Sequence, residues 1–164
     1  MWLDEDAFRG VVASTPLVSI DLVVQNEHGE LLLGHRLNRP AQGFWFVPGG
    51  RIQKNETLDE AFRRLTSGEL GIGFDRASAS LLGIYEHFYT DSVFGTAEGG
   101  IDTHYVVLAY HLQLPIDHHV LKAPIEQHSA YRWWPIIEIE ASAKVHGNSR
   151  AYLDALRIHM CKGK

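Results

Sequence analysis

Residues 50–72 read GRIQKNETLDEAFRRLTSGELGI, and this stretch decides the fold of the chain. Thr57 and Glu60 have the spacing of a capping box, in which a hydroxyl and a carboxylate accept the first backbone N–H groups of a helix. Gly71 is placed to end that helix in a left-handed conformation. Apolar side chains in between have helical spacing and predict a stripe that packs against a sheet: Leu58, Ala61, Phe62 and Leu65. We therefore expect an amphipathic helix that starts at Thr57.

The segment just before this helix reads as an aromatic strand followed by a turn. Residues 44–47 are FWFV, and Pro48, Gly49 and Gly50 follow. Because Gly49 and Gly50 lack a Cβ atom, we expect the backbone to turn sharply there and to bring a carbonyl group against a ligand.

The remaining periodicities predict an α/β chain with a mixed sheet and helices on both faces, in a single domain over residues 1–164. A helix over residues 4–12 is expected to begin at an Asp4 N-cap. Strands are expected at residues 17–24, 30–35, 80–89, 103–114 and 132–134. A helical turn after Pro135 should pack Ile136, Ile137 and Ile139, and a last helix, capped by Asn148 or Ser149, should pack Tyr152, Leu153, Leu156 and Ile158.

Composition excludes several classes of protein. The 164 residues carry a formal charge of −5, which argues against a general nucleic-acid binder, because such proteins present a basic face. No apolar run approaches the length of a membrane span, and the N-terminal sequence does not read as a secretory signal. The lone Cys161 suits a cytoplasmic protein. We expect no nucleic-acid partner, no membrane partner and a cytoplasmic location.

Several charged residues stand where a site would form. Asp21 interrupts an apolar strand, which is costly unless the carboxylate is paired or faces a site. Arg36 and Arg51 bracket the glycine turn, and the planar guanidinium group suits diphosphate oxygens. Arg39 reads as a surface residue that serves solubility. Glu56 and Arg64 lie near one face of the helix, where an ion pair would fix the loop that presents Gly49.

The spacing of Gly50, Glu56, Arg64 and the run Glu69-Leu70-Gly71-Ile72 resembles the Nudix box, the loop-helix-loop of hydrolases that act on nucleoside diphosphates linked to another moiety. This resemblance implies an α/β/α sandwich. Two positions depart from the general box: Leu65 follows the arginine, and Gly68 replaces one of a pair of glutamates. Fewer carboxylates should hold fewer divalent ions, so we expect one metal ion.

These departures resemble one subfamily, the GDP-mannose mannosyl hydrolases. The resemblance covers nearly the whole chain, including residues 14–19, 38–43, 104–107, 126–128, 131–133 and 148–152. It implies a homodimer with a nucleotide-sugar substrate. It also implies one Mg²⁺ per site, for which Mn²⁺ could substitute. The implied ligands are the Gly49 carbonyl, the Glu69 carboxylate and the Gln127 amide oxygen.

The resemblance further assigns roles in the reaction. Water would attack the anomeric carbon with inversion and release GDP and free mannose, or glucose from GDP-glucose. His128 is the implied general base, and Asp21 and His87 are second choices that could orient the water or the sugar. Arg36 would contact the leaving group, with Tyr105 and Arg51 on the phosphates. Leu3 and Phe8 match positions near the nucleotide, although Phe8 fits simple core packing equally well.

Two other functions stay open. One is a Nudix pyrophosphatase that cleaves the P–O–P linkage of a dinucleotide or nucleotide sugar, which would need more box carboxylates than Leu65 and Gly68 leave. The other is a nucleotide-sugar sensor without turnover, against which the joint presence of Glu69, Gln127 and His128 argues.

Overall fold

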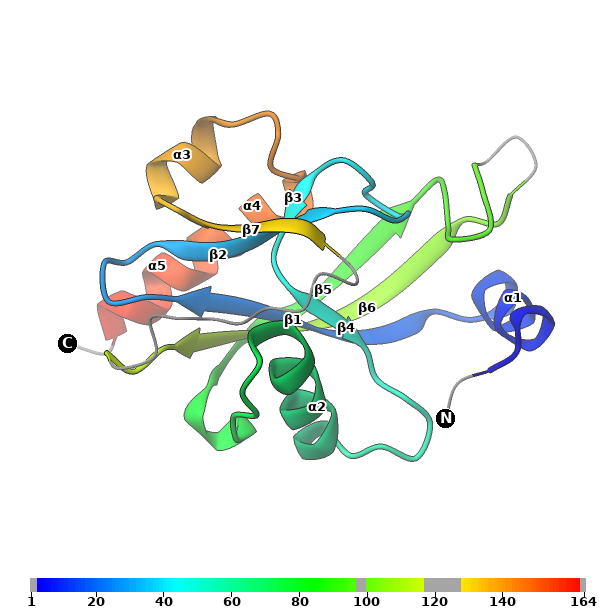
Figure 1. Ribbon diagram of the computed structural model, residues 1–164, viewed down its shortest axis with the longest axis horizontal. Helices are drawn as coiled ribbons and strands as arrows, with labels where there is room; N and C mark the ends of the chain where they lie inside the picture. Colours follow the sequence, from blue (N-terminus) through cyan, green and yellow to red (C-terminus); the bar gives the residue numbers. More distant parts are fainter. Residues whose placement is uncertain (1–2, 97–99, 117–127, 163–164) are drawn as a thin grey trace.

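The computed structural model describes residues 3–96, 100–116 and 128–162, and its centre is a seven-stranded mixed sheet (Figure 1). The strand order is β3-β2-β1-β6-β5, with β4 paired to β1 and β7 paired to β2. β1 and β6 run parallel, and the other pairs are antiparallel. The strands are β1 (Leu17–Gln25), β2 (Leu31–Arg36), β3 (Trp45–Phe46), β4 (Gly49–Arg51), β5 (Ser80–Tyr89), β6 (Thr103–Gln113) and β7 (His128–Trp134).

The helices lie on both faces of this sheet, which confirms the predicted architecture (Figure 1). Side chains of β1 alternate between the faces. Ile20 and Leu22 pack in one core with Phe62 of α2, whereas Val23 packs in the other core with Leu156 of α5. The helices are α1 (Glu5–Ser14), α2 (Leu58–Leu70), α3 (Ile136–Ala141), α4 (Gly147–Arg150) and α5 (Tyr152–Lys162), with a 3₁₀ turn at Arg76–Ser78.

The start and end of α2 agree with the sequence prediction. Thr57 is the N-cap, and both hydrogen bonds of the capping box with Glu60 are present. Gly71 ends the helix with a φ of 76°. The apolar stripe is buried at Ala61, Phe62 and Leu65, but Leu58 is 37% exposed. Leu58 opens the first turn of α2, and the buried residues of the helix begin only at Ala61.

The prediction of a sharp turn at Gly49 and Gly50 was wrong. Both residues belong to β4, and neither has a positive φ. A Cβ atom on Gly49 would lie 2.4 Å from the Ile20 carbonyl oxygen, and one on Gly50 would lie 2.7 Å from a Leu65 methyl group. The glycines are therefore needed because β4 is pressed between β1 and α2.

The remaining helices agree with the sequence prediction at the first helix cap and differ from it near the C-terminal end. Asp4 caps α1 as expected, with its carboxylate 2.8 Å from the Ala7 nitrogen. α4 is capped by His146, not by Asn148 or Ser149, because the imidazole Nδ1 accepts the Asn148 N–H. Ile137 and Ile158 are 72% and 58% exposed, since they point away from the sheet that buries Ile139 and Leu156. In the parts of the chain described, no helix has the length and apolar character needed to cross a bilayer.

Candidate active site

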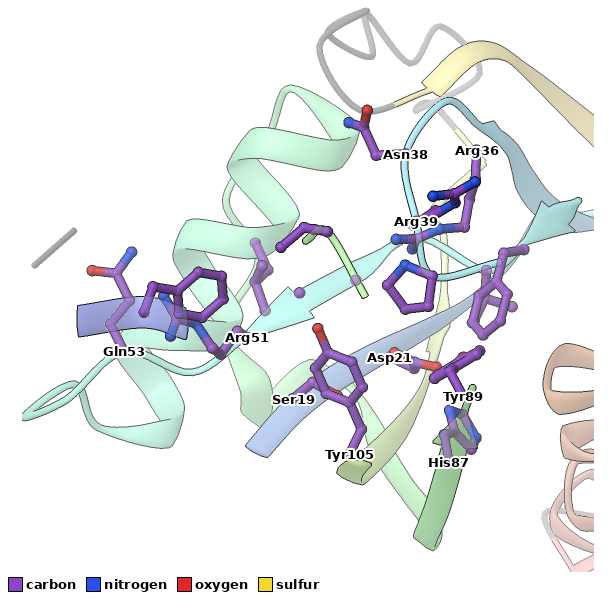
Figure 2. A pocket seen from close by; sticks show the side chains of 18 of the residues that line it. Ser19, Asp21, Arg36, Asn38, Arg39, Arg51, Gln53, His87, Tyr89 and Tyr105 are labelled. Atoms are coloured by element: carbon purple, nitrogen blue, oxygen red, sulfur yellow. The ribbon is translucent and has the colours of Figure 1, made fainter. Parts of the chain in front are cut away.

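An open cavity of about 370 Å³ lies where β1, β4, β5 and β6 meet the loop that follows β2 (Figure 2). Its described lining holds four arginines but only one carboxylate, that of Asp21. The cavity is therefore electropositive within an acidic chain, and it suits an anionic ligand. The lining residues are Leu3, Phe8, Ser19, Asp21, Arg36, Asn38, Arg39, Pro40, Phe46, Val47, Gly49, Gly50, Arg51, Gln53, Arg64, Leu65, His87, Tyr89, Val93 and Tyr105.

The arginines reach the cavity from opposite sides, with Arg36 and Arg39 on one side and Arg51 on the other (Figure 2). The Nε atom of Arg36 is buried and has no hydrogen-bond partner among the described residues. Arg51 lies over the Phe8 ring, 4.3 Å from its centroid. The Arg39 side chain is 40% exposed, in line with the surface position that we predicted, but it also lines the cavity and lies 3.7 Å from the Asp91 carboxylate.

The ion pair between Glu56 and Arg64 is confirmed, with N–O distances of 2.6 and 2.8 Å. Arg64 also donates to the Arg51 carbonyl oxygen at 3.0 Å, and Glu56 accepts the backbone N–H of Gln53 at 2.9 Å. Arg64 lowers the pKa of Glu56 through this hydrogen bond. Together these contacts fix the loop that joins β4 to α2, as the spacing indicated.

Asp21 of β1 and His87 of β5 both line the cavity (Figure 2). The Tyr152 hydroxyl donates to Asp21 Oδ2 at 2.6 Å and lies 3.3 Å from His87 Nε2. Burial raises the pKa of Asp21 from 3.8 to about 7, although the Tyr152 hydrogen bond and the charge of Arg36 oppose this change. Burial lowers the pKa of His87 from 6.5 to about 4, with a further contribution from His146.

Glu69 is a buried carboxylate on the face of α2 that meets β4. It is 5% exposed and accepts the Tyr131 hydroxyl at 2.8 Å. Burial raises the pKa of Glu69, while the Tyr131 hydrogen bond and the charge of Arg36 oppose the rise. Glu69 stands one helical turn beyond Leu65, whose methyl group contacts Gly50. The predicted box glutamate therefore lies on the side of α2 that approaches the glycines of β4.

The Gly49 carbonyl points away from β1. The antiparallel pair of β1 and β4 has hydrogen bonds from Leu22 to the Pro48 carbonyl at 2.8 Å and from Ile52 to the Val18 carbonyl at 2.9 Å. Because hydrogen-bonded and non-hydrogen-bonded pairs alternate along such strands, the Asp21–Gly49 pair is a non-hydrogen-bonded one. A backbone oxygen at this strand edge, together with a buried carboxylate, fits the oxygen ligation that Mg²⁺ prefers. Across the described residues, His, Cys, Asp and Glu side chains form no group of three or more that could hold a metal ion.

The other predicted residues are placed unevenly. Leu3, Phe8 and Tyr105 line the cavity, and Tyr105 directs its hydroxyl into it (Figure 2). Burial raises the pKa of Tyr105. His128 begins β7, and its backbone is opposite Arg36, but its side chain lies outside the described part of the chain. Gln127 lies outside the described residues altogether.

Several residues that the structure brings to this region had no site role in the sequence analysis, and four of them bear on the chemistry. Tyr89 and Asn38 line the cavity, Tyr131 binds Glu69, and Tyr152 binds Asp21. The apolar stripe of the last helix predicts that Tyr152 serves core packing. Only the structure shows that the Tyr152 hydroxyl also donates a hydrogen bond to a buried carboxylate, that of Asp21, which lies 131 residues earlier in the chain.

Three comparisons place the chain among known proteins. The NUDIX domain profile matches residues 15–156. The chain is 40% identical over 154 residues to the low-salt glycan biosynthesis protein Agl8 of Haloferax volcanii, covering 94% of this chain and 90% of that protein. The MutT protein of Methanosarcina mazei Go1 shares the fold, with a TM-score of 0.69, 20% identity and coverage of 92% and 99%. The NUDIX domain of Shewanella oneidensis NrtR, solved with ADP-ribose, superposes with a TM-score of 0.68 at 19% identity, covering 96% and 94%.

Proposed function

We propose that this chain, which belongs to the NUDIX domain family, hydrolyses GDP-mannose to GDP and free mannose, with GDP-glucose as an alternative substrate. The match to Agl8 supports a sugar nucleotide as the substrate, since that protein is named for glycan biosynthesis. The electropositive cavity supports a diphosphate.

The observation that carries this proposal is the placement of the box carboxylates: Glu69, which is not among the residues that line the described cavity, is the one buried on the side of α2 that approaches the glycines of β4. Residues 56–69 contain four acidic residues. Glu56 is held by Arg64, Asp59 by Arg76 at 2.6 Å, and Glu60 by the capping box. Glu69 accepts the Tyr131 hydroxyl and is buried beside the charge of Arg36. A site with one helix carboxylate favours one metal ion that neutralises a leaving diphosphate, over the several that direct attack at phosphorus would use.

The residues that would hold Mg²⁺ are Gly49 through its carbonyl, Glu69, and Gln127 through its amide oxygen. Nudix hydrolases generally use divalent metal ions, and Mn²⁺ would substitute here. When bound, the ion supplies positive charge to the diphosphate as it departs.

Different side chains of the cavity bind different parts of the substrate. Arg36, Arg51 and Tyr105 bind the diphosphate. The Nε–H of Arg36, which has no hydrogen-bond partner among the described residues, gives a further donor for the negative charge that grows on the leaving group. Leu3 and Phe8 contact the nucleoside, at the end of the cavity where Phe8 already packs against the Arg51 guanidinium.

The reaction is a displacement at the anomeric carbon. Asp21 and His87 orient the sugar and the attacking water, and His128 takes the proton of that water. The new C–O bond forms as the bond from the anomeric carbon to the diphosphate oxygen breaks, so GDP leaves and the free mannose has the inverted configuration at its anomeric carbon.

Product analysis tests this function. The protein is incubated with GDP-mannose and Mg²⁺, nucleotides are separated by anion exchange, and the first-formed anomer of mannose is read by proton NMR. We expect GDP and β-mannose. GMP with mannose 1-phosphate would show a pyrophosphatase, and tight binding without any product would show a sensor.

A further inference from the structure

The C-terminal helices contact residues of the cavity wall on the side that faces away from the cavity. α4 and α5 pack on the face of the sheet that carries Asp21, His87 and Tyr89 (Figures 1 and 2). Two of their side chains, Asn148 and Tyr152, make hydrogen bonds to residues that line the cavity. Neither Asn148 nor Tyr152 lines the cavity itself.

The Tyr152 hydroxyl determines which atoms of its neighbours are left for a ligand. It has one proton, which it donates to Asp21 Oδ2 at 2.6 Å, so it can only accept from His87 Nε2 at 3.3 Å. His87 then carries its proton on Nε2 and keeps a lone pair on Nδ1. Asp21 Oδ1 and His87 Nδ1 make no hydrogen bond to any described residue, so when Asp21 is ionised both atoms are left as acceptors.

Asn148 leaves Tyr89 as a hydrogen-bond donor to a ligand, not as an acceptor. Its side-chain nitrogen donates to the Tyr89 hydroxyl at 3.1 Å. Because that hydroxyl oxygen accepts here, its own proton is left to donate elsewhere. With Asp21 ionised, the wall of the cavity thus presents two acceptors and one donor, a set that the hydroxyl groups of a sugar can satisfy because each hydroxyl both donates and accepts.

We propose that Tyr152 and Asn148 are positioning residues, which orient Asp21, His87 and Tyr89 so that the cavity binds the hydroxyl groups of the sugar. This inference rests on the proposed function, since it concerns the sugar end of the same substrate. It extends that function to a segment that touches no substrate and follows the box by about 80 residues.

Tyr152→Phe tests the proposal because it removes one hydroxyl and keeps the ring. Tyr85→Phe is the matched control: the Tyr85 ring packs against Tyr152 with centroids 4.8 Å apart, but its hydroxyl makes no hydrogen bond to any described residue. We expect kcat on GDP-mannose to fall about 10- to 100-fold in Tyr152→Phe and to stay near the wild-type value in Tyr85→Phe. The affinity for GDP, which lacks the sugar, should change by less than about twofold.

A double-mutant cycle shows whether Tyr152 acts through Asp21. Asp21→Asn combined with Tyr152→Phe should lose no more activity than Asp21→Asn alone, because the hydroxyl would have nothing left to orient. Losses that multiply would overturn the proposal. The proposal would also be overturned if Tyr152→Phe weakened GDP binding by the same factor by which it lowers kcat, because that result would mark a general structural defect.

Two further measurements keep the proposal testable. If Tyr152→Phe does not fold, Asn148→Ala at its half-buried position tests the same idea, with the same expected loss of kcat and unchanged GDP binding.

If the wild-type protein releases no sugar, the proposed function fails separately, and calorimetry decides the inference. Tyr152→Phe should then weaken the binding of GDP-mannose about 10-fold more than that of GDP. Equal weakening of both would refute it.

Discussion

Asp21→Asn should change how the stability of this protein depends on pH. Burial raises the pKa of Asp21 from 3.8 to about 7 in the folded protein, so between these values the folded state binds more protons than the unfolded state. The contribution of Asp21 to stability is therefore fully present below pH 3.8 and is lost as the pH rises through 7. A shift of about three pKa units corresponds to roughly 4 kcal/mol.

Asparagine does not titrate, so the variant escapes this loss. The free energy of unfolding of Asp21→Asn, minus that of the wild type, should rise by roughly 4 kcal/mol between pH 4 and pH 8. His87 has the opposite trend, since burial lowers its pKa from 6.5 to about 4 and its contribution is lost as the pH falls through that range. Because both proteins contain His87, its contribution cancels in the difference.

Urea unfolding followed by tryptophan fluorescence, in EDTA to remove metal ions, measures this difference across the pH range. Asp154→Asn is the control for loss of a carboxylate, because that side chain is 90% exposed. A difference for Asp21→Asn that stays constant within about 1 kcal/mol from pH 4 to pH 8 would refute the reasoning, since it would mean that Asp21 is ionised in the folded protein at the same pH as in the unfolded chain.

Four further substitutions test the site. Arg36→Met should lower kcat about 100- to 1000-fold, whereas Arg63→Met, on the exposed face of α2, should not; equal activity of the two would exclude Arg36 as the leaving-group contact. Glu69→Gln should raise the Mg²⁺ concentration needed for half-maximal activity by about 100-fold or more, and an unchanged metal titration would rule out Glu69 as a ligand. His128→Gln should reduce turnover by about 100-fold with GDP affinity preserved, and near-normal turnover would disprove its role as base. Glu56→Gln should cost about 1 kcal/mol in urea unfolding, since Arg64 is partly exposed and its ion pair is screened; no change would mean that the pair does not stabilise the loop.

Local chemistry explains why some features of the fold could be predicted from the sequence. The capping box at Thr57 and the left-handed Gly71 depend on residues within one helix, and both were correct. Strand periods likewise predicted β5 over its full length. The purpose of Gly49 was misjudged because it depends on how closely β4 packs against β1, which a linear pattern does not contain.

The candidate site was predictable only in part, for a related reason. Arg36, Arg51 and Tyr105 follow from their place near the box and from the family resemblance, and they do line the cavity. The place of Arg39 in the cavity lining could not be predicted, because its neighbour Asp91 is distant in sequence. The roles of Gln127 and the His128 side chain stay predictions.

The position of bond cleavage tests the central claim most directly. The protein is given GDP-mannose and Mg²⁺ in water enriched in heavy oxygen, and the products are weighed by mass spectrometry. Attack at the anomeric carbon predicts that the label enters mannose and that GDP is unlabelled. Label in GMP or in mannose 1-phosphate would place the attack at phosphorus and would contradict the account.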